Sequence, residues 1–322
     1  FGLEKNLAKM RRDLEKYRIT YDTWFFESTL HDSGYVKETV DLLTQKGATY
    51  ESEGALWLRT SDYGCEKDDV LRRANGFYTY FAADIAYHRN KFEQRGFDRV
   101  INIWGADHHG HVARLKAALD ILGLDGSHRL EIVLMQLVRL MRDGEVVRMS
   151  KRTGKAITLS DLLDEISCDA ARYFFNSRAA DTHLEFDLGL AVREDNENPV
   201  YYVQYAHARV KSILRNLEQE GVQCNENPDL SLLKSEEELE LIRELARLPE
   251  EIRLAARDRE PSRINRYVNN VAAAFHRFYT VSRIRDAETE ALRDARVYLI
   301  RQVATVIENG LSVFGVTAPD KM

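Results

Sequence analysis

The sequence predicts an α/β domain over residues 1–195, followed by an all-α domain over residues 196–322. Two observations support this prediction. An apolar run at residues 99–105 is followed by a polar turn and then by the helical pattern of residues 112–122, which is one strand–turn–helix unit of a parallel sheet. From Pro199 onward, long stretches with apolar residues at helical spacing and few glycines replace this pattern.

The composition excludes several classes of protein. The chain has 322 residues, of which 44% are apolar and 30% charged, values typical of a globular protein with two domains. A net charge of −6 gives no overall attraction to nucleic acid, so any RNA-binding surface must be a local patch. Three widely spaced cysteines make neither a disulfide framework nor a four-thiolate zinc site. We therefore expect a cytoplasmic protein without a signal peptide or membrane span.

The first part of the chain alternates helical and extended patterns. We expect helices at residues 1–17 and 35–46, a hairpin over 49–60 and a strand at 70–72. The chain begins inside the first of these helices, so we expect it to be a fragment of a longer protein.

The next segment carries the first candidate site. Residues 77–92 are rich in aromatic side chains, and on a helix Tyr80 and Asp84 would share one face because they are four residues apart. The turn at residues 107–111 follows the strand at 99–105, at its carboxyl end. Ligands of parallel α/β sheets bind at that end.

A cationic loop follows the next apolar run. Residues 130–140 predict a strand, and Asp143-Gly144 predicts a tight turn because glycine accepts positive φ. The loop at residues 148–152 then reads Arg-Met-Ser-Lys-Arg. Three cations beside a hydroxyl suit the reversible binding of an anion such as a nucleotide phosphate. The alternative interpretation is an exposed basic hairpin tip. Beyond the loop we expect a helix at 158–166, capped by Ser160, and helical structure at 169–178.

The second half predicts long helices over residues 202–218, 236–257, 262–285 and 288–311, with a loop at 221–233. Its helices mix aromatic and basic residues, which suit the stacking of unpaired bases and contacts to phosphates. The residues of this mixture are Tyr202, Tyr205, His207, Arg209, Arg263, Arg266, Tyr267, Phe278 and Tyr279.

The loop at 148–152 resembles the KMSKS loop of class I aminoacyl-tRNA synthetases, with Arg148 in place of the first lysine. Residues 105–111, 169–175, 198–209 and 315–322 then fall in the order that is typical of arginyl-tRNA synthetases. The sequence resembles the bacterial form of this family over nearly its whole length. The resemblance implies the second half of a Rossmann-type catalytic domain, followed by a helical anticodon-binding bundle.

The HIGH-type motif of the family would lie upstream of all these stretches. Residues 108–111 resemble it superficially, but they lie too close to the KMSKS-like loop, and the family has its own similar stretch at this place. We therefore interpret them as a different element. A fragment without the HIGH half is expected to be inactive alone.

The resemblance implies roles for individual residues. Lys151 is the main cation that stabilises charge on the phosphates of ATP; Arg148 keeps a charge, Ser150 offers a hydroxyl and Met149 packs the loop. Tyr80 and Asp84 bind the arginine side chain. Asp107 and His108 border the pocket for substrate and adenosine. The expected RNA contacts are Arg263, Arg266 and Tyr267.

The implied partners are ATP with Mg²⁺, L-arginine and tRNA(Arg), and we expect a monomer. Two other functions stay open. A non-catalytic tRNA-binding module would keep the fold without the chemistry. A metal-dependent hydrolase could be built on residues 107–111, although adjacent histidines rarely point at one metal, so we expect no bound metal.

Overall fold

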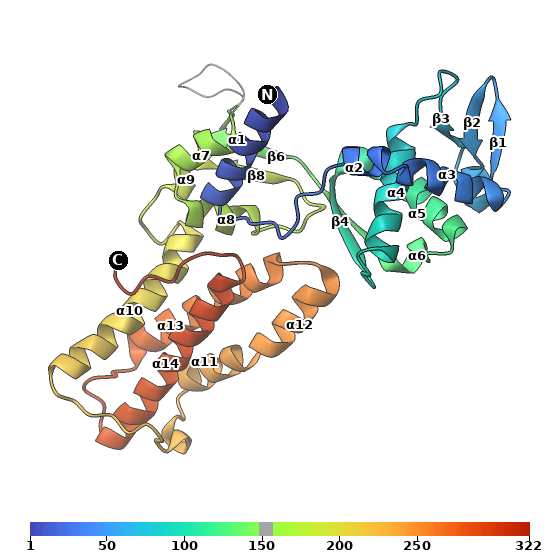
Figure 1. Cartoon of the computed structure of the whole chain (residues 1–322). Helices are drawn as coiled ribbons and strands as arrows, with labels where there is room; N and C mark the ends of the chain where they lie inside the picture. Colours follow the sequence, from blue (N-terminus) through green and yellow to red (C-terminus); the bar gives the residue numbers. More distant parts are fainter. Residues whose placement is uncertain (148–156) are drawn as a thin grey trace. The chain divides into compact units, whose positions relative to one another are not determined.

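The computed structural model of the chain describes residues 1–147 and 157–322 (Figure 1). The chain forms two compact units. The small unit is Tyr21–Leu137, and the large unit combines Phe1–Thr20 with Val138–Met322. These units do not follow the linear division at residues 195 and 196, because the N-terminal helix and the segment from Val138 group with the long helices. Among the described residues, no helix is long and apolar enough to cross a membrane.

The small unit contains an antiparallel sheet, a parallel strand pair and five α-helices of different lengths. The sheet is formed by β1 (Thr49–Ser52), β2 (Ala55–Leu58) and β3 (Asp69–Arg72). The parallel pair is β4 (Val100–Gly105) and β5 (Leu130–Met135). The helices are α2 (Ser28–Asp32), α3 (Tyr35–Gln45), α4 (Tyr80–Glu93), α5 (His109–Leu122) and α6 (Gly126–Arg129). The predicted hairpin and the strand–turn–helix unit are therefore confirmed.

The helix α4 lies at the centre of the small unit. It begins after Thr79, whose hydroxyl accepts a hydrogen bond from the backbone N–H of Ala82, as an N-cap residue does. Its buried face includes Phe81 and Ile85, which pack in one core with Leu43 of α3 and Leu115 of α5. This packing fixes the direction in which the opposite, polar face of α4 points.

The prediction of a single strand over residues 130–140 is wrong, because these residues form two strands. β5 ends at Met135 and pairs with β4 in the small unit. β6 (Val138–Arg142) pairs instead with β7 (Glu145–Val146) and β8 (Leu184–Asp187) in the large unit. The apolar composition continues through both strands, so it does not show where the pairing partner changes.

The first part of the large unit combines a three-stranded sheet with helices of 4 to 15 residues. β6 and β7 are joined by Asp143 and Gly144, which have φ values of 51° and 78°. These values confirm the predicted tight turn. The helices of this part are α1 (Gly2–Lys16), α7 (Leu159–Glu165), α8 (Cys168–Phe175) and α9 (Leu188–Ala191). The predicted cap of α7 is wrong: Thr158, not Ser160, accepts the hydrogen bond from the backbone N–H of Asp161.

The long helices form a bundle in which α10, α13 and α14 lie side by side (Figure 1). Their bounds are Pro199–Gln219 for α10, Ser262–Val281 for α13 and Glu290–Ser312 for α14. The helix predicted over 236–257 is two helices, α11 (Glu236–Ala246) and α12 (Leu248–Asp258). Pro249 explains the break, because its ring clashes with the carbonyl four residues earlier in a continuous helix.

Candidate functional site

The first candidate site is centred on Asp84, on the polar face of α4. The Asp84 side chain is 38% exposed, and its Oδ2 accepts a hydrogen bond of 2.8 Å from Nε2 of His111. Nε of Arg114 donates to Nδ1 of the same histidine at 2.7 Å. Because a guanidinium can only donate, Nδ1 must accept, and the proton of the neutral imidazole lies on Nε2. His111 therefore presents an N–H to Asp84.

The network continues below the surface of the small unit. Nη1 of Arg114 lies 2.5 Å from Oδ1 of Asp69, a buried carboxylate of β3. The rings of Phe81 and Trp104 each lie 5.4 Å from the His111 ring. His111 itself is 8% exposed. The packing and the hydrogen bonds together leave the imidazole a single orientation.

The backbone of Asp84 is held by a second histidine. Nδ1 of His88 donates to the carbonyl oxygen of Asp84 at 2.7 Å, and its Nε2 accepts from Nδ2 of Asn102 at the same distance. Burial, followed by the charge of nearby Lys91, lowers the pKa of His88 to about 4. Burial also lowers the pKa of Lys91, to about 8. His88 therefore stays neutral at physiological pH.

The remaining predicted substrate residues lie at the exposed edge of the small unit. Tyr80 is the first residue of α4 and is 69% exposed, one helical turn before Asp84. The side chains of Asp107 and His108, in the turn after β4, are 81% and 62% exposed. Gly105 precedes this turn, and a Cβ there would lie 2.5 Å from Oδ1 of Asp107. Tyr80 and Asp84 thus share a helix, and His111 connects Asp84 to the start of α5.

Sequence reasoning missed most of the support for Asp84. The sequence indicates His111 only as a possible metal ligand, and no pattern in it marks Arg114 or Asp69. These partners come from β3 and α5, far from Asp84 along the chain, and no local pattern marks such a pairing. The described residues contain no group of three His, Cys, Asp or Glu side chains placed to hold a metal.

The predicted catalytic residues belong to the KMSKS-like loop. Arg148, Met149, Ser150 and Lys151 lie outside the described residues. Up to Val147, the chain follows the antiparallel pairing, with the N–H of Val147 donating to the carbonyl oxygen of Leu140 at 2.8 Å.

The three residues predicted to contact RNA differ in accessibility. Arg266 is exposed, and its Nη1 lies 3.4 Å from the hydroxyl of Ser262. Arg263 is 27% exposed and faces Glu251 at 3.6 Å. Tyr267 is only 2% exposed, and its hydroxyl donates to the carbonyl oxygen of Glu244 at 3.0 Å. The prediction that Tyr267 contacts RNA is wrong, because its ring lies in the core of the bundle.

A group of aromatic side chains that suits base stacking better than Tyr267 lies on α10 and α13. Tyr201 and Tyr205 stack with nearly parallel rings, 6° apart at 6.1 Å, and the His276 ring lies 6.1 Å from Tyr205 at 23°. The Arg209 guanidinium lies 5.4 Å from the Tyr205 ring and 4.4 Å from that of Tyr279. Burial, followed by the charge of Arg209, lowers the pKa of His276. We call these five residues the aromatic ladder; the spacing of Tyr201, Tyr205 and Arg209 at four-residue intervals could have indicated it.

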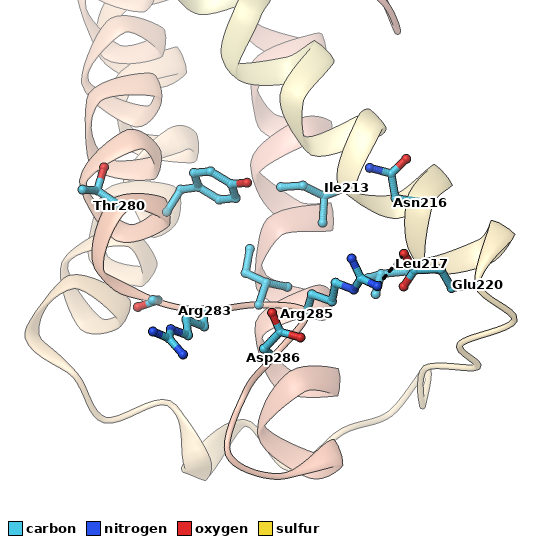
Figure 2. A pocket seen from close by; sticks show the side chains of 11 residues that line it. Ile213, Asn216, Leu217, Glu220, Thr280, Arg283, Arg285 and Asp286 are labelled. Carbon is cyan, nitrogen blue, oxygen red and sulfur yellow. Dashed lines mark ion pairs between the residues drawn. The ribbon is translucent and has the colours of Figure 1, made fainter.

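A cavity of about 400 Å³ lies where α10 and α13 end (Figure 2). Ile213, Leu217 and Ile284 give it apolar walls. Its charged lining consists of Arg283, Arg285, Glu220 and Asp286, and Arg285 pairs with Glu220 at 3.0 Å. Two cations and two carboxylates cancel, so this cavity does not concentrate positive charge for a phosphate.

Comparison with known proteins places these features in a class. The sequence model of the catalytic domain of class I tRNA synthetases (R) matches residues 5–188, and that of the DALR anticodon-binding domain matches residues 203–322. A methionyl-tRNA synthetase structure from Mycobacterium tuberculosis has the same fold, with a TM-score of 0.70 at 13% identity over 97% of this chain and 78% of its own. The chain thus has the architecture of a class I aminoacyl-tRNA synthetase.

Closer relatives narrow the assignment. The chain is 57% identical to an arginine–tRNA ligase of Caldanaerobacter subterraneus and 54% identical to one of Acetivibrio thermocellus, in both cases over its whole length. A solved arginyl-tRNA synthetase from Campylobacter jejuni has a TM-score of 0.90 at 38% identity, over 99% of this chain and 68% of its own. The chain belongs to the arginyl-tRNA synthetase family. It spans 57% of the length of the two curated relatives.

Proposed function

We propose that this chain is part of an enzyme that joins L-arginine to tRNA(Arg) in the cytoplasm, using ATP and passing through arginyl-adenylate. The observation that carries the proposal is the placement of Asp84. Its carboxylate is partly open to solvent, is held by a buried histidine and belongs to the same packed unit as the turn after β4. A permanently charged guanidinium that leaves water needs such a carboxylate.

The other site residues complete the proposed chemistry. Tyr80 offers an aromatic face or hydroxyl to the arginine side chain, and Asp107 and His108 border the substrate and adenosine. In activation, a carboxylate oxygen of arginine attacks the α-phosphorus of ATP and pyrophosphate leaves. Lys151 and Arg148 would stabilise the negative charge on the phosphate oxygens, with the Ser150 hydroxyl beside them and Met149 packing the loop.

ATP is a substrate here, and Mg²⁺ would arrive with its phosphates. The described residues offer no acidic cluster for the ion, and Mg²⁺ commonly uses substrate phosphates and water with one or two carboxylates. Asp107 is the exposed carboxylate of the turn, and it is the residue we expect to face the ion or its water.

For tRNA, we propose that the aromatic ladder stacks unpaired bases and that Arg263 and Arg266 contact phosphates. Arg209 supports this role because it pairs with aromatic rings, and no carboxylate forms a salt bridge with it in the described part of the chain. We propose that the protein acts as a monomer.

Ligand binding by the small unit tests the proposal. L-Arginine and L-citrulline, its neutral isostere, should be titrated by calorimetry into the chain and into Asp84→Asn. Removing one member of a buried charge pair costs about 2–5 kcal/mol, so Asp84→Asn should weaken arginine binding by tens-fold or more and leave tRNA affinity unchanged. Asp41→Asn is the matched control, because Asp41 pairs with Lys37 on the surface of the same unit.

A non-catalytic tRNA-binding module is the alternative. It predicts tRNA binding without any preference for arginine over citrulline. Equal binding of the two amino acids by the unaltered chain would favour the module and contradict our proposal.

A further inference from the structure

We propose that His111 is a positioning residue for arginine selection: it holds Oδ2 of Asp84 so that Oδ1 faces the substrate guanidinium. This inference rests on the proposed function. Among the described residues, the hydrogen bond of Asp84 to a side chain is made by Oδ2, and Oδ1 has no protein partner. A carboxylate held by one oxygen offers the other in a fixed direction, which lowers the entropy lost when arginine binds.

His111 acts through Asp84 rather than on arginine. His111 is 8% exposed, and its ring lies 5.4 Å from the rings of both Phe81 and Trp104. Both ring nitrogens are engaged, Nε2 with Asp84 and Nδ1 with Arg114. No face of the imidazole remains for a substrate.

Arg114 sets which nitrogen of His111 carries the proton. The guanidinium is anchored by Asp69 at 2.5 Å and lies 5.0 Å from the Phe81 ring. In the other tautomer, an N–H of His111 would face an N–H of Arg114, and a lone pair would face the Asp84 carboxylate. Both contacts would be repulsive, so Arg114 keeps a donor directed at Asp84.

Two substitutions separate hydrogen bonding from packing. His111→Gln keeps an acceptor for Arg114 and a donor for Asp84, whereas His111→Phe keeps a ring next to Phe81 and Trp104 without either group. Loss of one hydrogen bond to a charged group should weaken arginine binding about tenfold in His111→Phe. His111→Gln should stay within about threefold of the unaltered chain. Citrulline binding should change little in either variant, and His128→Phe, at an exposed position of α6, is the control.

The arginine-to-citrulline ratio distinguishes positioning from folding, because general loosening of the unit would weaken both ligands. The ¹⁵N spectrum of the His111 ring gives a second readout that does not depend on arginine. In the unaltered chain we expect the Nε2–H tautomer. In Arg114→Met we expect this tautomer to be lost or to be mixed with the Nδ1–H tautomer. Observation of the Nδ1–H tautomer in the unaltered chain would overturn the proposal.

The results also separate this proposal from the proposed function. Strong arginine preference in the unaltered chain that survives in His111→Phe would refute the positioning role alone. Failure of the unaltered chain to prefer arginine would refute the proposed recognition by Asp84, and with it the role of His111. A tenfold loss in His111→Phe that is restored in His111→Gln supports both.

Discussion

Acidification should destabilise the small unit through His88. The ordinary pKa of histidine is 6.5, and burial lowers that of His88 to about 4 in the folded state. As the pH falls below 6.5, the unfolded chain binds a proton that the folded chain excludes. The free energy of unfolding therefore falls between pH 6.5 and pH 4. The difference between the two pKa values corresponds to a loss of roughly 3 kcal/mol in the free energy of unfolding, which is complete once the pH lies below both values.

Tryptophan fluorescence reports on the unfolding of the small unit alone. All three tryptophans of the sequence, Trp24, Trp57 and Trp104, belong to the small unit. Urea unfolding of this unit can therefore be followed by fluorescence at several pH values between 7 and 4.5, without a tryptophan signal from the large unit. The comparison variant is His88→Gln, whose side-chain carbonyl can still accept from Asn102 but does not titrate.

We expect the difference in unfolding free energy between the two proteins to change with pH. The unaltered chain should lose stability on acidification, and His88→Gln should lose about 2–3 kcal/mol less between pH 6.5 and 4.5. His109→Gln serves as the control, because the His109 side chain is exposed. Carboxylates that titrate in the same range affect all three proteins alike. Parallel pH curves for His88→Gln and the unaltered chain would refute the reasoning.

Three further predictions concern the chemistry. In the complete enzyme, Lys151→Ala should slow arginine-dependent ATP–pyrophosphate exchange by roughly 10²–10³ with little change in arginine affinity; an unchanged rate would make the loop a basic hairpin only. The present chain alone should form no arginyl-adenylate at an appreciable rate, and exchange at an ordinary synthetase rate would contradict this. Elemental analysis of dialysed protein should find no stoichiometric zinc; one tightly bound zinc per chain would restore the hydrolase interpretation of residues 107–111.

Local patterns were sufficient to predict the elements that carry the small-unit site. The four-residue spacing of Tyr80 and Asp84 indicates one face of a helix, and both lie on α4. The apolar run before Gly105 and the helical pattern after it give β4, the turn and α5. These signals work because each depends on residues that are neighbours in sequence.

The break within residues 130–140 depends on tertiary pairing. β5 lies beside β4 and β6 beside β8, yet apolar residues continue from one strand into the other. Composition reports that a segment is extended and buried, but not which strand lies beside it. The same limit explains why Asp84 was identified without His111, because their contact joins positions 27 residues apart.

The tyrosines of the bundle show where periodicity could have been used further. Tyr267 follows Ile264 by three residues and precedes Val271 by four, which places it on the apolar stripe of α13. That position alone predicts burial, and the ring is buried. Tyr201, Tyr205 and Arg209 share a different stripe, on α10, and all three side chains are partly exposed. A tyrosine that contacts RNA must lie off the core stripe of its helix, so Tyr205 replaces Tyr267 as the residue we expect to stack on an unpaired base.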